Sequence, residues 1–91
     1  MFVQFYLESN NHSYHSYHYD KVNLVDISNH KFPSGRNRKC LTFVLDNGTT
    51  VNFPLSEVAD LCIEDYADQR HPFNDDAKVI FVEDGQTYEK R

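Results

Sequence analysis

The stretch from Cys40 to Phe53 limits the fold more than any other, because a strand, a turn and a second strand can be read from it directly. Leu41, Phe43 and Leu45 occupy alternate positions, which is the period-two pattern of a half-buried strand. The segment Asp46-Asn47-Gly48 follows. A turn sequence of this kind between two apolar runs predicts a β-hairpin.

Two loop geometries are open for this hairpin, and they differ in which side chains face the core. A two-residue turn at Asn47-Gly48 would pair Val44 with Val51. A three-residue loop with Gly48 at positive φ would pair Phe43 with Val51 instead. We predict the three-residue loop, because it gathers the apolar side chains on one face. That face comprises Leu41, Phe43, Leu45, Val51 and Phe53, and the opposite face carries Thr42, Thr50 and Asn52.

The rest of the chain adds further strand signals. Alternation and β-propensity predict strands at Phe2–Leu7, His12–Asp20, Val22–Ile27, Lys78–Val82 and Gln86–Glu89. The last two are expected to pair as a hairpin, because a turn sequence of the same kind lies between them. His12–Asp20 follows a turn signal and is expected to return antiparallel to the first strand, with a disordered loop as the alternative. Ser28–Lys39 has no apolar period and contains Pro33-Ser34-Gly35, so it predicts a surface loop.

The segment from Leu55 to Asp68 fits a helix and a strand in different ways. Its apolar residues fall on one stripe at helical spacing, and Ser56 is a suitable N-cap. Against a helix, Glu64 would lie at the negative end of the helix dipole, while Leu61 and Ile63 fit a short strand better. We predict a helix around residues 55–67.

These elements predict a β-rich α+β fold, an antiparallel meander of five to seven short strands with one helix, and a small all-β barrel is the alternative. Ninety-one residues with 40% hydrophobic content predict one globular domain over residues 1–91. No apolar run is long enough to span a bilayer, and the amino terminus lacks a secretory signal. We therefore expect a cytoplasmic protein without a membrane partner, with Cys40 and Cys62 reduced and buried.

The net charge of -5 is distributed unevenly along the chain. Residues 1–53 carry five basic and four acidic side chains, whereas residues 54–91 carry four basic and ten acidic ones. This acidic half disfavours direct binding to nucleic acid, which depends on neutralising phosphates with Lys and Arg.

The acidic stretch from Glu57 to Asp76 contains seven carboxylates and one arginine. Charge runs are usually solvated surface. The functional interpretation is a small adaptor or inhibitor that docks on a basic partner protein, such as a nucleic-acid-binding one. The candidate partner-binding residues are Asp60, Glu64, Asp65, Tyr66, Asp68, Phe73, Asp75 and Asp76. Homo-oligomerisation is left open.

Two other clusters carry alternative hypotheses. Four of the nine cationic side chains lie in nine residues and could bind an anion with salt-sensitive affinity: Lys31, Arg36, Arg38 and Lys39. The histidines His12, His15 and His18 suggest a metal-binding protein, but on a flat strand His15 points away from the other two.

Enzymatic activity has no positive support in the sequence. The three glycines, at positions 35, 48 and 85, all lie in turn signals, so there is no phosphate-binding glycine loop. Paired carboxylates such as Asp75-Asp76 are adjacent, and adjacent side chains diverge on regular structure. We expect no catalytic residues and no cofactor.

Overall fold

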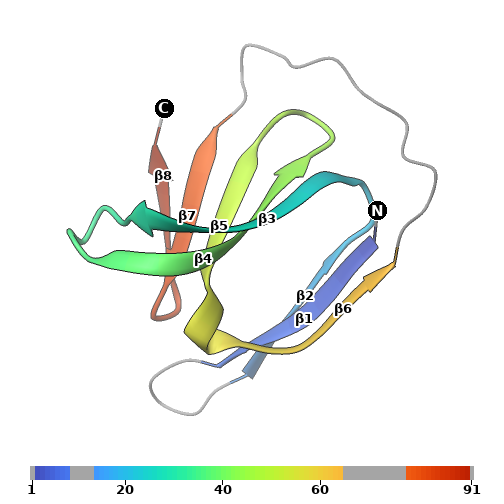
Figure 1. Ribbon diagram of the computed structural model, residues 1–91, viewed down its shortest axis with the longest axis horizontal. Coiled ribbons are helices and arrows are strands. Elements are labelled where there is room, and N and C mark those ends of the chain that lie inside the picture. The colour runs from blue at the N-terminus through green and yellow to red at the C-terminus, as the bar shows by residue number, and fades with distance from the viewer. Residues whose placement is uncertain (1, 9–13, 65–77, 91) are drawn as a thin grey trace.

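The computed structural model describes residues 2–8, 14–64 and 78–90, which form eight β-strands in two sheets (Figure 1). The smaller sheet has the strand order β2-β1-β6 and consists of β1 (Phe2–Glu8), β2 (Tyr14–Tyr19) and β6 (Val58–Glu64). The larger sheet has the order β3-β4-β5-β7-β8 and consists of β3 (Val22–Lys31), β4 (Asn37–Leu45), β5 (Thr50–Pro54), β7 (Val79–Glu83) and β8 (Gln86–Lys90). The β-rich character is confirmed, but the described strands form two sheets and not the alternative closed barrel.

The main core lies between the two sheets. Every second residue of β1 is buried, and Phe5 in its centre is fully enclosed. The Phe5 ring lies 4.8 Å from that of Phe53 and 6.2 Å from that of Phe43, both edge to face. Tyr17 stacks on Phe5 at 5.4 Å, so β2 also contributes to this cluster. These aromatic contacts join β1 and β2 to β4 and β5 across the two layers.

The hairpin of β4 and β5 has the predicted register. Phe43 pairs with Val51, and Leu41 pairs with Phe53. Gly48 has a φ of 87°, and the Gly48 amide donates to the carbonyl of Leu45 at 3.0 Å, so the loop has three residues as predicted. Leu41, Phe43 and Phe53 are fully buried, which confirms the apolar face.

Asn52 departs from the predicted polar, solvent-facing side of this hairpin, because it is buried. The larger sheet has a second, smaller core cluster on that side, formed by Phe32, Cys40 and Phe81. Asn52 remains satisfied there, since its amide oxygen accepts a hydrogen bond from Thr42 at 2.7 Å and its amide nitrogen donates to the carbonyl of Ile80 at 3.1 Å.

The predicted helix around residues 55–67 is wrong in its described part. Leu55–Glu57 (η1) form a single 3-10 turn, and β6 follows at once with Val58. β6 pairs antiparallel with β1 and so supplies the third strand of the smaller sheet. Asp60 has a φ of 53°, which is incompatible with a right-handed helix and accompanies the β-bulge between β1 and β6. Tertiary pairing overrides the helical spacing of the apolar residues.

The topology is not a pure antiparallel meander. β3, β4 and β5 pair antiparallel in sequence order, but β7 pairs with β5 in parallel, because β6 lies between them in the chain and belongs to the other sheet. The predicted β7–β8 hairpin is confirmed. Its turn has only two residues, Asp84 and Gly85, both at positive φ, as a type I′ turn requires.

Ser28 to Lys39 is not the surface loop that its polar composition predicts. β3 and β4 continue through most of this segment, and His30 pairs with Arg38. Phe32 anchors the hairpin tip, since it is buried and its ring lies 5.2 Å from that of Phe81. The end of β3 and the start of β4 lack apolar alternation, but they are stabilised by backbone hydrogen bonds between the strands and by the packing of Phe32.

Candidate functional site

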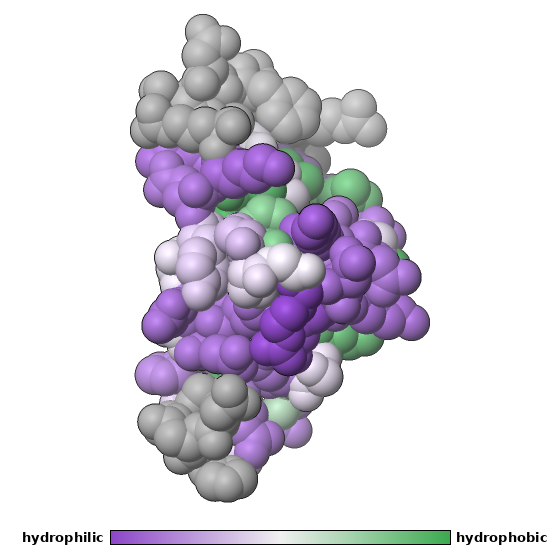
Figure 2. Space-filling model, turned by 90° about the vertical axis from the view of Figure 1, so that its left-hand side faces the viewer, coloured by the Kyte–Doolittle hydropathy of each residue, from purple (hydrophilic) through white to green (hydrophobic). Residues whose placement is uncertain are grey.

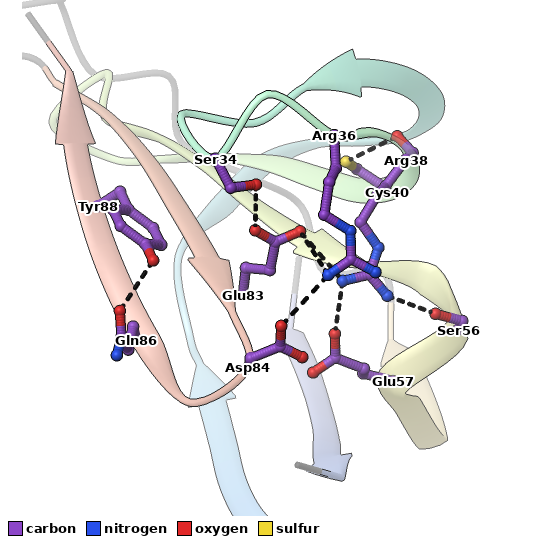
Figure 3. A network of polar contacts seen from close by, with 10 residues as sticks. All are labelled: Ser34, Arg36, Arg38, Cys40, Ser56, Glu57, Glu83, Asp84, Gln86 and Tyr88. Carbon is purple, nitrogen blue, oxygen red and sulfur yellow. Dashed lines mark hydrogen bonds and ion pairs between the residues drawn. The ribbon is translucent and has the colours of Figure 1, made fainter. Parts of the chain in front are cut away.

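The densest polar cluster in the described part of the chain centres on Arg38 (Figure 3). Its Nη1 atom lies 3.0 Å from Glu57 Oε2 and donates to Glu83 Oε2 at 3.2 Å, while Nη2 donates to Ser56 Oγ at 2.9 Å. Ser34 Oγ donates to the other oxygen of Glu83 at 2.6 Å. One guanidinium therefore ties together β4, the η1 turn and the end of β7, and the hairpin tip joins them through Ser34.

The charged side chains of this cluster are largely buried, which shifts the pKa values of its two glutamates. The side chains of Arg38 and Glu83 are only 16% and 3% exposed. Burial raises the pKa of Glu83, but the hydrogen bonds from Ser34 and Arg38, together with the charges of Arg36 and Arg38, outweigh it and bring the pKa below its ordinary value of 4.5. Burial is the main cause that raises the pKa of Glu57 above its ordinary value, and the positive Arg38 offsets this rise only in part, while the negative Asp84 adds to it.

The two glutamates should contribute to the pH dependence of stability with opposite signs. Glu83 stabilises the fold above its unfolded pKa near 4.5, and this contribution is lost as the pH falls through its lowered folded pKa. Glu57 has a folded pKa above 4.5, so its contribution is present below 4.5 and is lost as the pH rises through the folded value. In urea unfolding at a series of pH values, Glu83→Gln should reduce the loss of stability on acidification and Glu57→Gln should enlarge the net loss. Equal pH profiles for the two variants would contradict these assignments.

The candidate anion-binding residues are divided by the structure. Arg36, Arg38 and Lys39 line one open depression together with Asn37, Leu55 and Ser56, whereas Lys31 lines another. Arg36 Nη1 lies 3.4 Å from Asp84 Oδ2, and Arg38 is held by two glutamates. The surface on the side of the hairpin tip is largely hydrophilic (Figure 2). A phosphate would have to compete with carboxylates for these guanidinium groups, and anion binding stays a prediction.

The candidate partner-binding residues fall in two groups. Asp60 and Glu64 lie on β6, which is an edge strand of the smaller sheet and not a helix surface. The other six lie outside the described residues: Asp65, Tyr66, Asp68, Phe73, Asp75 and Asp76. The prediction that both cysteines are buried is wrong for Cys62, which is exposed on β6.

The smaller sheet brings together acidic side chains that are far apart in the sequence. Its three strands contain the carboxylates Glu8, Asp60 and Glu64 and no lysine or arginine. Its outer face also presents aromatic rings, since Tyr14 is 62% exposed and Tyr6 38% exposed. The register places Glu8 directly opposite Tyr14, so a carboxylate and an exposed ring lie side by side on this face.

The tyrosines were missed by the sequence reasoning, which searched for anchors only within the acidic stretch. A signal for Tyr6 was present, because the alternation of β1 places Val3, Phe5 and Leu7 inward and therefore Tyr6 outward. Placing Tyr14 on the same face required the register of β2 against β1, which local sequence does not provide.

The histidine cluster divides between the two faces of β2. His15 pairs with the inward-facing Leu7, whereas His18 pairs with the outward-facing Gln4. His18 Nε2 lies 2.5 Å from Asp20 Oδ1. His12 lies outside the described residues. Within the described residues, no three His, Cys, Asp or Glu side chains gather closely enough to hold a metal ion.

The cysteines are two free thiols in different environments. Cys40 is buried, and burial raises the pKa of its thiol more than the nearby backbone hydrogen bond and Arg38 lower it. A raised pKa opposes formation of the reactive thiolate. Cys62 is exposed on β6. No described helix has the length and hydrophobicity of a membrane span.

Comparisons with known proteins identify no relative. No protein family matches the chain, and no curated protein or solved structure is similar to it at the level required for a match.

Proposed function

We propose that this chain is a small protein-interaction module, an adaptor or inhibitor, which binds a basic partner surface through the acidic face. We define the acidic face as the outer face of the β2-β1-β6 sheet together with its β6 edge. The observation that carries the proposal is the composition of this sheet: three carboxylates and no lysine or arginine. The described lysines and arginines all lie elsewhere, in the strands and turns outside this sheet.

Charge and apolar exposure have complementary roles in this proposal. Carboxylates on one face attract a basic partner at long range and increase the association rate. Affinity requires large side chains that can be buried on contact, and tyrosine is enriched among such anchors. Tyr6 and Tyr14 supply them on the face, and Leu61 and Ile63 are exposed along the β6 edge. A partner with phosphates would instead be repelled, which disfavours nucleic acid as the direct ligand.

The charge requirement is tested with matched variants. The first combines Glu8→Lys, Asp60→Asn and Glu64→Lys, where asparagine is used because it tolerates the positive φ of Asp60. The control combines Asp46→Lys, Asp26→Asn and Glu89→Lys, which changes the net charge equally but alters residues outside the smaller sheet. Circular dichroism and thermal unfolding establish that both variants retain the fold.

Proteins captured from the native cell by the unmodified chain are then purified and their association rates measured at increasing salt. We expect the rate to fall as salt rises, because screening acts over a Debye length of about 8 Å at physiological ionic strength. The first variant should associate at least about tenfold more slowly at low salt, and the control should be nearly unchanged. Equal rates for both variants would remove the acidic face from partner recognition.

The anchors are tested separately through dissociation. A Tyr6→Ala, Tyr14→Ala variant should raise the dissociation rate of the same complex by about tenfold or more, since truncating an anchor residue typically costs over 1 kcal/mol. Leu24→Ala, which removes an exposed apolar side chain from the other sheet, is the control. An unchanged dissociation rate in the double tyrosine variant would show that the partner does not contact this face.

A further inference from the structure

β3 is an edge strand and is longer than the other described strands. It spans ten residues, forms the outer edge of the larger sheet and pairs only with β4 among the described strands. Two apolar side chains on it are exposed: Leu24 at 56% and Ile27 at 49%. A long edge strand with exposed apolar residues is a template for pairing with another strand.

The other described edges, β2, β6 and β8, are all shorter than β3, and β2 has only six residues. Two of them also carry features that oppose such pairing. β6 has a bulge at Asp60 and the carboxylate of Glu64, both of which oppose edge-to-edge contact. β8 has only five residues and ends in the exposed charges of Glu89 and Lys90. Asp26 is the single carboxylate within β3. Among the described edges, β3 therefore offers the longest surface for pairing with another strand.

We propose that β3 pairs antiparallel with β3 of a second copy of this chain, with the two-fold axis at Ile27. The two larger sheets then join edge to edge into one continuous sheet. A two-fold axis between antiparallel strands is perpendicular to the sheet, so each residue must meet a residue of the same face. Only registers centred on a residue of β3 satisfy this condition.

These registers differ in which charged residues face each other and in how many residues of β3 are paired. With Ile27 at the axis, Asp26 faces the partner's Ser28 and Lys31 faces the partner's Asn23, so no like charges meet. The two Ile27 side chains form a β-branched cross-strand pair, an arrangement that stabilises sheets. This register also pairs β3 over almost its whole length.

Neighbouring registers are worse on the same criteria. An axis at Asp26 places that carboxylate directly opposite its own copy, which is destabilising. An axis at Ser28 shortens the paired segment and places Ile27 against the partner's Asn29. An axis at Leu24 leaves only the first part of β3 paired and runs into the irregularity between Val22 and Leu24.

The register is tested by cysteine cross-linking. Single cysteines replace Leu24, Asp26, Ile27 or Ser28 in a Cys62→Ser background, since Cys62 is exposed and Cys40 is buried. Residues at the axis have Cα atoms about 4.5 to 5.5 Å apart, within disulfide range. Residues one step from the axis are separated by about 8 Å, which exceeds that range. We expect Ile27→Cys to form covalent dimers fastest under mild oxidation. Fastest cross-linking at any other position would overturn the register.

The association itself is tested by sedimentation velocity and equilibrium. A single edge-to-edge contact is a small interface, so we expect a dimer with a dissociation constant of about 1 to 100 μM. Ile27→Lys should raise this constant by about tenfold or more, because two lysines then meet at the axis. The matched control is Ile63→Lys, the same change at 42% exposure on β6. A monomer up to about 1 mM, or a dimer weakened by Ile63→Lys and not by Ile27→Lys, would refute the proposal.

Discussion

Replacing Phe43 with alanine is expected to lower the free energy of unfolding by about 3 to 5 kcal/mol, the cost of truncating a fully buried aromatic residue. Phe43 is completely enclosed and lies in the centre of the core between the sheets. Its ring is 5.5 Å from that of Phe53 and 4.8 Å from that of Tyr19. Truncation removes these contacts and leaves a cavity that the paired strands cannot close. Urea unfolding followed by circular dichroism measures the change.

Tyr14→Ala is the matched control for Phe43→Ala, because it also truncates a strand aromatic but at an exposed site. It should change stability by less than about 0.5 kcal/mol, as surface substitutions usually do. Comparable losses in the two variants would mean that the outer face of the smaller sheet is buried in solution. A loss below about 1 kcal/mol for Phe43→Ala would contradict the packing of the two sheets on each other.

Replacing Arg38 with alanine is expected to destabilise the protein by about 3 kcal/mol at neutral pH, the low end of the range for breaking a buried ion pair. The substitution leaves Glu83 buried without its main cationic partner and removes the counter-charge of Glu57. The low end applies because the Arg38 side chain is 16% exposed, which admits some water to the vacated site. Urea unfolding at neutral pH measures this loss.

Two further variants separate the buried charge from other causes. Arg36→Ala removes an exposed guanidinium from the same cluster and should cost less than about 1 kcal/mol. Adding Glu83→Gln to Arg38→Ala should recover part of the loss, because the uncompensated carboxylate is then absent. If the double variant is less stable than Arg38→Ala by the full cost of Glu83→Gln alone, the two residues do not interact.

The sequence contained enough information for the β4–β5 hairpin because every determinant of it is local. Alternating apolar residues select a face, and a glycine at positive φ fixes the loop length, so the pairing of Phe43 with Val51 follows. The same reasoning predicted the β7–β8 hairpin.

Tertiary structure decided the conformation of residues 55–64. The apolar spacing there suits a helix, but β1 has backbone hydrogen-bonding groups along both of its edges, and β2 satisfies only those along one edge. Pairing β6 on the other side stabilises the smaller sheet more than a local helix would, and the positive φ of Asp60 absorbs the mismatch. Strand pairing is a long-range interaction, so the local sequence could not decide between the strand signal of Leu61 and Ile63 and the helical spacing of the other apolar residues.

Both the Arg38 cluster and the acidic face are formed by residues that are far apart in the sequence and meet only in the folded protein. Arg38, Glu57 and Glu83 are far apart in the chain and meet only because three separate elements converge. The sequence by itself determined the local hairpins, the acidic balance and the alternation that turns Tyr6 outward, since these depend on neighbouring residues. The tertiary structure alone decided which charges are neutralised and which strands remain as edges, because Coulomb interactions and backbone pairing depend on distance in space and not on separation along the chain.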